Sequence, residues 1–316
     1  MSDGPYSKHE WALILGGSSG FGLATAQKLA RHGLNICVVH RDRRGAMRRI
    51  EPEFEAIQAS GVGFVAFNKD ALKPDGQAEI LDSLAEAIGP DGRVRLLLHS
   101  IAFGNLKLIA PESDSSDEAT QQLAEKLGLS AEAVREAADG LFEEAVDGVQ
   151  GIAAAPAYAQ EKFLEDDDVA RTIYAMGTSL LSWTRALSDR GMFAEDSRVL
   201  GMTSEGNEVA WKGYAAVAAA KVALESVSRS IAVEMAHIGI RSNIVQAGVT
   251  DTPALRAIPG SQNLKAQART RNPFGRLTTP GDVADVIYLL SLPEAAWING
   301  AIIRVDGGER ISGLSR

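Results

Sequence analysis

The chain has 316 residues, 45% hydrophobic and 23% charged, and a formal net charge of −9. This composition excludes a fibrous or disordered chain, and the length allows two domains or one large α/β unit with an insertion. The single cysteine, Cys37, excludes an internal disulfide, and no Cys and His cluster has zinc-ligand spacing. The net negative charge argues against nucleic acid as a main partner. With no signal-peptide pattern and no apolar run near the roughly 18 residues that span a bilayer, we expect a soluble, cytoplasmic protein without a membrane partner.

Seven short apolar runs alternate with helical stretches outside one acidic segment. The runs lie at residues 11–17, 34–40, 62–67, 93–100, 197–204, 240–248 and 301–308. Such alternation predicts βαβ units on a parallel sheet. Because the runs are apolar throughout, both faces of the sheet should be covered. The sequence therefore predicts a doubly wound parallel sheet in a single α/β domain over residues 1–316.

The acidic segment interrupts this alternation. Residues 112–168 hold sixteen acidic and three basic side chains, so they carry a charge of −13 and leave the rest of the chain at +4. We expect an acidic, mainly helical insertion over residues 109–163. One interpretation is that these charges lie on a solvated surface, as most such runs do. The other is that the insertion, which closely follows the fourth run, acts as a lid over the active site.

Two helices are expected inside this insertion. A capping box of Ser115 and Glu118 begins the first helix, and Gly128 ends it. Ser130 caps the second helix, and Gly148 ends it. Apolar residues at helical spacing mark one face of each helix: Leu123 and Leu127 in the first, and Val134, Ala138 and Leu141 in the second.

A glycine-rich turn follows the first run and precedes a helical stretch. Gly16, Gly20 and Gly22 have the spacing GxxxGxG, with Ser18, Ser19 and Phe21 between them. Glycines allow the backbone to approach a pyrophosphate, whose charge then lies at the helix N-terminus. The position of the loop at the first strand predicts a Rossmann-type dinucleotide site.

The end of the second run bears on which dinucleotide is bound. An NAD site places an acid there for the ribose 2′-hydroxyl, whereas this run ends at His40 and continues with Arg41, Arg43 and Arg44. Guanidinium groups suit a 2′-phosphate, so NADPH is favoured over NADH. Alternatively, the arginines are a solvated helix start and Asp42 binds the ribose of NAD.

Two tyrosines precede a lysine on the same helical face. Three residues separate Tyr158 from Lys162, and six separate Tyr214 from Lys221. Neither spacing is informative alone. Tyr158 lies in the acidic block with no strand before it, whereas Tyr214 follows the run at 197–204 and opens a long helix. We therefore select Tyr214 and Lys221.

Together these motifs resemble the short-chain dehydrogenase/reductase family over nearly the whole chain outside the insertion. Further residues that carry the resemblance are Asp70, the HSIAF segment at 99–103, Asn243, Ala247, Gly248, Thr252 and the VDGG segment at 305–308. The resemblance implies an NAD(P)H-dependent oxidoreductase that forms a homo-oligomer, commonly a tetramer. The cofactor-binding residues that it adds to those of the first two strands are Asp70, Ala71, Ser100, Ile101, Ala102, Lys221, Ala247, Gly248, Thr250 and Thr252.

Within this family, the six-residue spacing and HSIAF in place of NNAG resemble the bacterial enoyl-acyl-carrier-protein reductases. Met176 stands where ordinary members have a helical Asn, and residues 251–277 resemble the NADPH-using type. Many enoyl reductases have a second Tyr ten residues before the catalytic one. Here that position is Ser204, a small residue, as in the NADPH-using type.

The spacing fits reduction of a double bond conjugated to a thioester. Seven residues turn a helix by about 700°, so Tyr214 and Lys221 share a face but lie about 10 Å apart along the axis, against about 6 Å for YxxxK. The displaced phenol suits a thioester oxygen, two carbons beyond the carbon that receives hydride. We assign Tyr214 as donor to that oxygen, with Ser204 beside it, and Lys221 to the nicotinamide ribose. The alternatives are carbonyl reduction, as of a 3-ketoacyl thioester, and a non-catalytic NADP-binding regulator.

The segment from Ala254 to Pro280 carries only basic charge. Its cations are Arg256, Lys265, Arg269, Arg271 and Arg276. In the family this segment forms the substrate loop, so its charge could recruit the carrier of an acyl thioester, either an acidic acyl carrier protein or coenzyme A. Equally, it could dock on the acidic insertion of the same or a neighbouring subunit.

Overall fold

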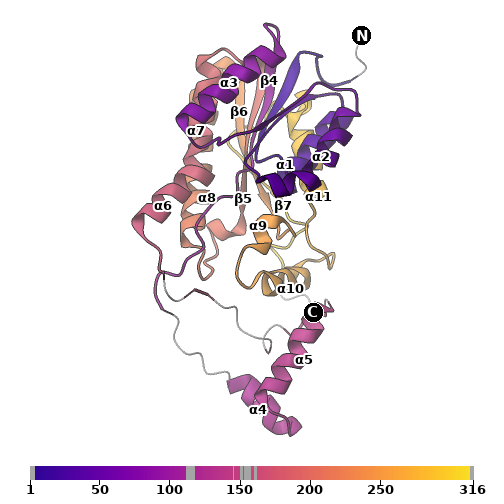
Figure 1. Cartoon of the computed structure of the whole chain (residues 1–316), viewed down its shortest axis with the longest axis vertical. Helices are drawn as coiled ribbons and strands as arrows, with labels where there is room; N and C mark the ends of the chain where they lie inside the picture. Colours follow the sequence, from indigo (N-terminus) through magenta and orange to yellow (C-terminus); the bar gives the residue numbers. More distant parts are fainter. Residues whose placement is uncertain are drawn as a thin grey trace.

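The computed structural model describes residues 4–111, 118–144, 146–149, 152, 158–159 and 162–313. Its strands are β1 Glu10–Leu15, β2 Asn35–His40, β3 Phe64–Asn68, β4 Arg93–His99, β5 Phe193–Ser204, β6 Ile240–Ala247 and β7 Ile302–Val305. They form one parallel sheet in the order β3-β2-β1-β4-β5-β6-β7. Each strand overlaps an apolar run of the sequence, so the predicted doubly wound sheet is confirmed (Figure 1).

Helices cover both faces of this sheet (Figure 1). One face carries α1 Gly20–Arg31, α2 Arg44–Gln58 and α11 Pro280–Ser291, and the other carries α3 Pro74–Ile88, α7 Ser179–Asp189 and α8 Ala215–Glu234. The remaining helices are α4 Glu118–Leu127, α5 Ala131–Glu143, α6 Asp166–Ile173, α9 Pro253–Arg256 and α10 Ser261–Arg271. A π-helical turn, η1 Tyr174–Thr178, joins α6 to α7, and the 3₁₀ turns are η2 Glu205–Asn207, η3 Ala236–Ile238 and η4 Pro293–Ala295.

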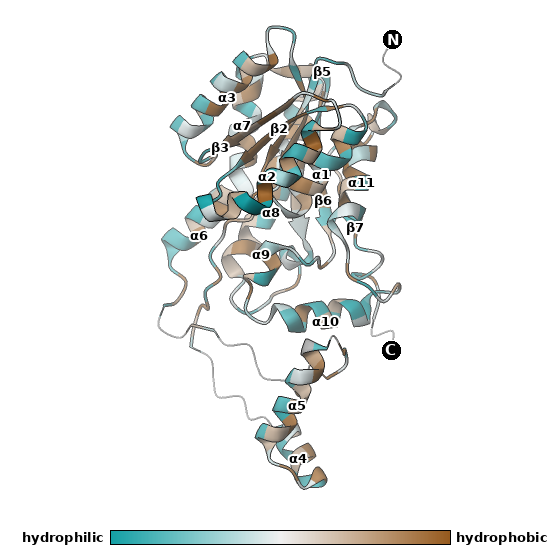
Figure 2. Cartoon of the chain, turned by 45° about the vertical axis from the view of Figure 1, so that its right-hand side comes forward, coloured by the Kyte–Doolittle hydropathy of each residue, from teal (hydrophilic) through white to brown (hydrophobic). Residues whose placement is uncertain are grey.

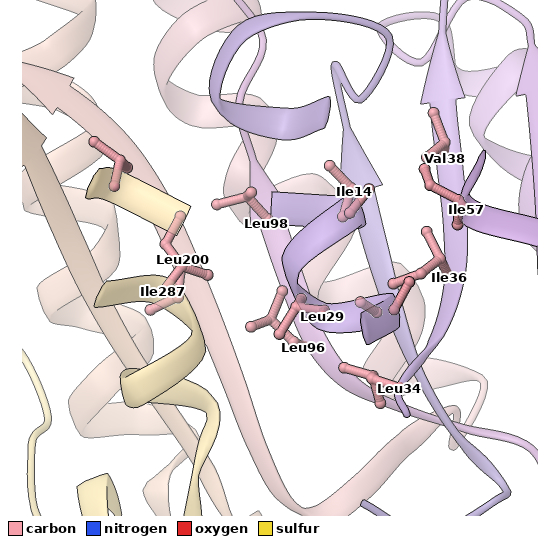
Figure 3. Close-up of a cluster of buried hydrophobic side chains, with 14 of the residues drawn as sticks. Ile14, Leu29, Leu34, Ile36, Val38, Ile57, Leu96, Leu98, Leu200 and Ile287 are labelled. Atoms are coloured by element: carbon pink, nitrogen blue, oxygen red, sulfur yellow. The ribbon is translucent and has the colours of Figure 1, made fainter. Parts of the chain in front are cut away.

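Successive residues of the central strands point to opposite faces, and both faces are apolar. Ile14 of β1 belongs to the core beneath α1 and α11, which Figure 3 shows, whereas its neighbours Leu13 and Leu15 belong to the core beneath α7 and α8. All three are fully buried. Burial on both sides explains why the runs read as continuously apolar.

The strand order reverses direction beside β1. The chain builds β2 and β3 on one side of β1 and then returns to place β4 on the other side. Loops that follow β1 and β4 therefore diverge at the carboxyl edge of the sheet, which is where open α/β sheets bind ligands.

The two helices of the insertion are present, but they pack through other residues than expected. Ser130 accepts a hydrogen bond from the Ala133 N–H at 3.1 Å and caps α5 as predicted, while Ser115 lies outside the described residues. Gly128 follows the end of α4, in the left-handed region. The expectation that Gly148 ends the second helix is wrong, because α5 ends at Glu143.

The face of α4 was also mispredicted. Thr120 and Ala124 are its buried residues, whereas Leu127 is 58% exposed. On α5, Val134 and Ala138 are buried as expected, but Leu141 is 38% exposed. Small side chains let the two short helices approach each other, which a search for large apolar residues does not detect. Figure 1 shows this pair lying beyond α10, away from the sheet.

The hydropathy of the elements follows their place in the layers (Figure 2). Strand β2 is largely brown, whereas α10 is largely teal and lies outside the sheet layers. In the described part of the chain, no helix is long and apolar enough to cross a membrane.

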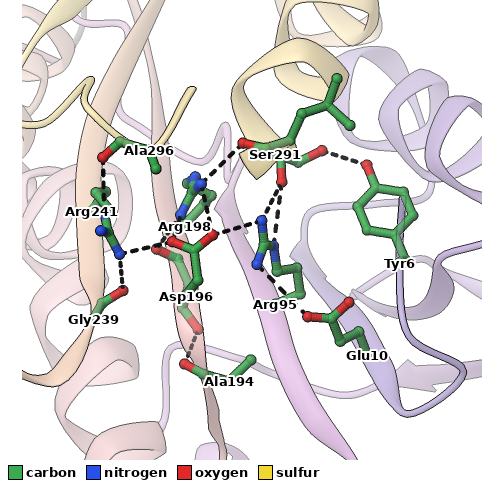
Figure 4. Close-up of polar contacts among 12 residues, drawn as sticks. Tyr6, Glu10, Arg95, Ala194, Asp196, Arg198, Gly239, Arg241, Ser291 and Ala296 are labelled. Carbon is green, nitrogen blue, oxygen red and sulfur yellow. Dashed lines mark hydrogen bonds and ion pairs between the residues drawn. The ribbon is translucent and has the colours of Figure 1, made fainter. Parts of the chain in front are cut away.

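An ionic cluster joins the amino-terminal ends of strands β4, β5 and β6 to the end of α11 (Figure 4). Asp196 forms an ion pair with Arg95 of β4 at 2.9 Å and accepts hydrogen bonds from Arg198 of β5 at 2.5 Å and from Arg241 of β6 at 2.7 Å. The first two arginines are buried and also donate to the carbonyls that end α11, those of Leu290, Ser291 and Leu292. Cations at a helix C-terminus are favourable, and here they attach the helix to the sheet.

Asp196 is the shared counter-ion of this cluster, so its charge can be tested. Burial raises the pKa of Asp196, but the hydrogen bond from Arg198 and the charges of all three arginines hold it below its usual value. We expect Asp196→Asn to lower the free energy of unfolding by about 3 kcal/mol, because it leaves the buried Arg198 guanidinium without its anion and leaves Arg95 with only Glu10, at 3.7 Å. Urea unfolding measures this loss, with exposed Asp91→Asn as the control. Equal stability of the two variants would contradict the role of Asp196.

Candidate active site

A cleft of about 550 Å³ opens at the carboxyl edge of the sheet. The turn after β1, the ends of β2 and β4, the start of α8 and the loop after β6 all line it. This is the edge at which the strand order reverses, so the fold alone predicts the place of the cleft.

The glycine loop forms one wall by very close backbone approach. A Cβ on Gly16 would lie 2.5 Å from the Ser100 carbonyl oxygen, and one on Gly22 would lie 2.2 Å from the Gly16 carbonyl oxygen. Ser19 precedes α1 without a side-chain capping bond, and the first turn of α1 holds no acid. The loop thus presents a helix N-terminus to the cleft, and its residues fit a pyrophosphate.

A cation lies at the end of β2, across the cleft from the glycine loop. The strand ends at His40 as predicted, and Arg41 and Asp42 line the cleft, whereas Arg43 and Arg44 do not. Arg41 Nη1 donates to Asp70 Oδ2 at 3.0 Å, and its guanidinium lies 4.5 Å from the centre of the Phe103 ring. The Asp42 carboxylate is engaged by His40 Nδ1 at 2.9 Å.

Tyr214 projects into the cleft from the N-cap position of α8. Its side chain is buried, and it packs beside Trp211 with ring centres 5.5 Å apart. Gly206 is required there, because a Cβ would lie 2.4 Å from the Tyr214 ring. Burial raises the pKa of Tyr214, and the nearby Ser204 hydroxyl opposes this only in part, so the phenol keeps its proton at neutral pH.

Lys221 lies two turns further along α8 and also lines the cleft. It is 7% exposed, and its ammonium donates to the Met202 carbonyl oxygen at 2.8 Å. Burial lowers the pKa of Lys221 to about 8, while Glu225 opposes the shift. Behind it, burial and the charge of Lys221 lower the pKa of His99 to about 3, so this imidazole, hydrogen-bonded to Ser179 at 2.7 Å, is neutral.

The remaining wall of the cleft is apolar, and most of its residues were not predicted from the sequence. Met176 lies in the π-helical turn η1, which approaches α8 closely because Gly177 faces the Ala220 carbonyl oxygen. Such turns concentrate at functional sites, but no sequence pattern used above detects one. The other apolar side chains of this wall are Leu72, Leu106, Trp211, Val217, Leu255 and Ile258.

Nearly all the expected site residues meet in this one cleft. Those lining it are Gly16, Ser18, Ser19, Gly20, Phe21, His40, Arg41, Asp70, Ala71, Ser100, Ile101, Ala102, Ser204, Tyr214, Lys221, Ala247, Gly248, Thr250 and Thr252. Gly22 is the exception, since it lies behind the loop and supports Gly16. Tyr158 does not line the cleft, but packs on Gly213 and donates to the Lys212 carbonyl oxygen at 3.3 Å.

An arginine attaches α10 to the cleft. Arg271, the last residue of α10, donates to Glu205 at 2.6 Å and to Glu309 at 3.1 Å. Both carboxylates are buried, and Glu205 lines the cleft beside Ser204. Burial, followed by the charge of Glu205, raises the pKa of Glu309 to about 7 although Arg271 opposes it. Two carboxylates therefore compete for one guanidinium.

The other cations of the segment from Ala254 to Pro280 also have acidic partners in this chain. Arg256 and Lys265 pair with Asp251, and Arg276 pairs with Asp282. Arg269 binds Asp147 of the insertion through two nitrogens, with the shortest contact at 2.6 Å. Docking on the insertion of the same chain thus occurs, but it accounts for one of the five cations.

Known proteins resemble this chain in sequence and in fold. Residues 129–309, more than half of the chain, match the family model described as "Enoyl-(Acyl carrier protein) reductase". The chain is 25% identical over 297 residues to the 3-oxoacyl-[acyl-carrier-protein] reductase MabA of Mycobacterium tuberculosis, covering 94% of this chain and 91% of that protein.

Another relative matches over a shorter stretch. The cis-4-hydroxycyclohexanecarboxylate dehydrogenase of Sinomonas cyclohexanicum is 36% identical over 118 residues, which are 37% of this chain. The chain spans 44% of the length of that dehydrogenase. This similarity is therefore local.

Solved structures share the fold over almost the whole chain. FabI from Candidatus Liberibacter asiaticus has a TM-score of 0.71 at 17% identity, and 96% of each chain is covered. A short chain dehydrogenase from Burkholderia cenocepacia, solved in complex with NADP, has a TM-score of 0.67 at 22% identity, covering 95% of this chain and 97% of that one. At these identities the likeness establishes the fold.

The contact between Arg271 and Glu309 generates a prediction for stability against pH. The pKa of the Glu309 carboxyl is 4.5 in the unfolded chain and about 7 in the fold, so the folded state binds this proton more tightly. The protein is therefore most stable, with respect to this group, below pH 4.5. It loses that stability as the pH rises to about 7. We expect Glu309→Gln, which cannot ionise, to remove a decline worth up to about 3 kcal/mol over this window.

Urea unfolding between about pH 4.5 and about pH 8 measures this decline. Glu294→Gln changes an exposed carboxyl on η4 and is the matched control, which should keep the wild-type slope. A wild-type slope in Glu309→Gln would show that the carboxyl does not titrate in this range.

Proposed function

The chain belongs to the short-chain dehydrogenase/reductase family of NAD(P)-dependent oxidoreductases, and on this premise we propose that it reduces the C2–C3 double bond of a trans-2-enoyl thioester with NADPH. The observation that carries the proposal is the placement of Tyr214 and Lys221. Six residues separate them, yet both are buried and line one cleft. The chain is thus an oxidoreductase by family, and the enoyl thioester is the substrate that this spacing favours.

The chemistry follows from where negative charge develops. NADPH, held by the residues of this cleft, would supply hydride to C3 of an enoyl thioester, and negative charge would then develop on the thioester oxygen, two carbons away. A phenol displaced by almost two helical turns from the lysine suits this distant oxygen better than a carbonyl at the carbon attacked. Tyr214 is protonated at neutral pH because burial raises its pKa, so it can donate to the oxygen as charge develops.

Lys221 supplies positive charge and binding to the nicotinamide ribose. Among the described residues its ammonium donates to one acceptor, the Met202 carbonyl oxygen, which fixes the side chain along β5. Its other N–H groups are available to the ribose hydroxyls. With a pKa of about 8, most of the lysine is protonated at neutral pH.

The apolar wall supports an acyl substrate. Met176, Trp211, Val217 and Ile258 surround Tyr214 with hydrocarbon and indole surface. Burying the chain of a fatty acyl group against such a wall is favourable, whereas a sugar would leave polar groups unpaired there. The wall therefore favours an acyl thioester over a polyhydroxylated carbonyl substrate.

Arg41 supports NADPH as the cofactor. It is the arginine of this region that lines the cleft, and its pairing with Asp70 together with the Phe103 ring holds the guanidinium there. Asp42, the acid that would bind a free ribose 2′-hydroxyl, is already engaged by His40. The Arg41 guanidinium suits a 2′-phosphate, and the neighbouring Asp42 carboxylate is already hydrogen-bonded to His40.

The proposal also covers the carrier of the acyl substrate and the oligomeric state of the protein. We propose a thioester of an acyl carrier protein or of coenzyme A, since the cations near the cleft already have acidic partners and so do not distinguish the two carriers. A homotetramer is proposed from the family resemblance. The second candidate reaction is reduction of a 3-ketoacyl thioester, which the similarity to MabA over 94% of the chain favours.

One assay separates these reactions. Loss of NADPH absorbance is followed with crotonyl-CoA or a longer enoyl thioester and, separately, with the matching 3-ketoacyl thioester. We expect oxidation with the enoyl substrate and a lower rate when NADH replaces NADPH. Oxidation with the ketoacyl substrate alone would overturn the enoyl assignment, and equal rates with both cofactors would overturn the NADPH preference. No oxidation with any thioester would favour the NADP-binding regulator.

The choice between the two tyrosines gives a further prediction. Tyr214→Phe removes the proposed donor, and we expect turnover to fall by about 100-fold or more with NADPH binding retained. Tyr158 does not line the cleft, and Tyr158→Phe removes its hydrogen bond to the Lys212 carbonyl oxygen, so turnover should stay near the wild-type rate. Steady-state kinetics of both variants test this matched pair. The opposite ranking would mean that Tyr158 is the donor.

A further inference from the structure

A third buried acid, besides Glu205 and Glu309, lies one helical turn beyond Lys221. Glu225 of α8 is 7% exposed, and its Oε1 accepts from Thr203 Oγ1 and from Asn207 Nδ2, both at 2.7 Å. Thr203 lies on β5 and Asn207 in η2, on either side of the cleft residue Ser204. The carboxylate thus connects the helix that carries Lys221 to the strand end that carries Ser204.

Both hydrogen-bond donors to Glu225 are uncharged, which leaves its negative charge without a direct ionic partner among the described residues. A buried carboxylate without compensation is costly. The compensating cation is Lys221, because residues four apart on a helix lie on one face, about 5–6 Å between Cβ atoms. The attraction is mutual, and it opposes the effect of burial on the pKa of Lys221.

Of the titratable groups that face Lys221 from α8 and β4, the others supply no negative charge, and Glu205 of η2, which lines the same cleft, is paired with Arg271. His99 faces it from β4 and is neutral, because burial and Lys221 lower its pKa to about 3. Tyr214, on the same helix, is a neutral phenol because burial raises its pKa. Glu225 is therefore the group on α8, β4 and β5 that can keep the ammonium charged.

We infer that Glu225 is a positioning residue, whose buried carboxylate holds Lys221 in its ammonium form and thereby sets the alkaline limit of cofactor binding. For turnover the inference rests on the function proposed above, whereas for binding it needs only the nicotinamide nucleotide common to the family. The same carboxylate orders residues 203–207. From there Asn207 Oδ1 accepts from Gln246 Nε2 at 3.2 Å, which extends the order to β6.

Two substitutions separate charge from shape. Glu225→Gln keeps the length and an acceptor oxygen but removes the charge, while Glu225→Asp keeps the charge and shortens the side chain. Glu234→Gln, at an exposed glutamate of the same helix, is the control. NADPH affinity is measured by fluorescence titration between about pH 6 and about pH 9.5, with thermal unfolding as the check on folding.

In the wild type we expect NADPH affinity to decline as Lys221 loses its proton near pH 8. In Glu225→Gln the decline should begin at least about one pH unit lower, since removing a nearby opposite charge shifts a pKa by about 1–3 units. A shift of one unit gives about a fivefold difference in affinity at pH 8, which approaches about tenfold at higher pH. Glu225→Asp and Glu234→Gln should keep the wild-type midpoint.

The reverse ranking, a wild-type profile in Glu225→Gln and a changed one in Glu225→Asp, would overturn the inference and show a purely structural role. If Glu225→Gln does not fold, a lowered midpoint in Glu225→Asp would overturn it. Because the titration contains no thioester, its outcome is independent of the enoyl assignment, which the substrate assay tests.

Discussion

Parallel strand pairing is the constraint on which the site depends. All seven strands point the same way, so the loops that follow β1, β4, β5 and β6 meet at one edge. At the reversal between β1 and β4, the glycine turn and the segment after His99 approach so closely that Gly16 has no room for a side chain beside Ser100. Residues more than 200 positions apart in sequence thereby line one cleft. At the opposite edge of the sheet, arginines on three neighbouring strands share Asp196, and two of them, Arg95 and Arg198, also donate to the carbonyls that end α11.

The electrostatics of the cleft follow from burial. The phenol of Tyr214 and the imidazole of His99 are held neutral, while Lys221 stays largely charged because Met202 and Glu225 compensate it. A neutral donor beside one ammonium suits a reaction that moves negative charge onto a substrate oxygen. The same low-polarity surroundings that raise the pKa of Tyr214 also provide the apolar wall around it.

The charged outer segments act mainly within the chain. In the sequence, the run of basic residues around α10 indicated a surface for an acidic partner. In the structure, each cation has an acid nearby, and Arg271 and Arg269 attach α10 to the cleft and to the insertion respectively. Ion pairs within the chain thus hold the end of α10 beside the cleft, because Glu205, the partner of Arg271, lines it.

Local pattern determined the seven strands, the glycine turn and the pairing of Tyr214 with Lys221, because each is a short-range regularity of hydrophobicity, turn chemistry or helical spacing. Three features depended on the tertiary structure. The π-helical turn at Met176 forms against α8, where Gly177 permits close packing. The packing face of α4 consists of Thr120 and Ala124, whose small size matters only once α5 lies against it. The charges of Glu205, Glu225 and Glu309 act through burial and partners that are distant in sequence, so no local pattern reveals them.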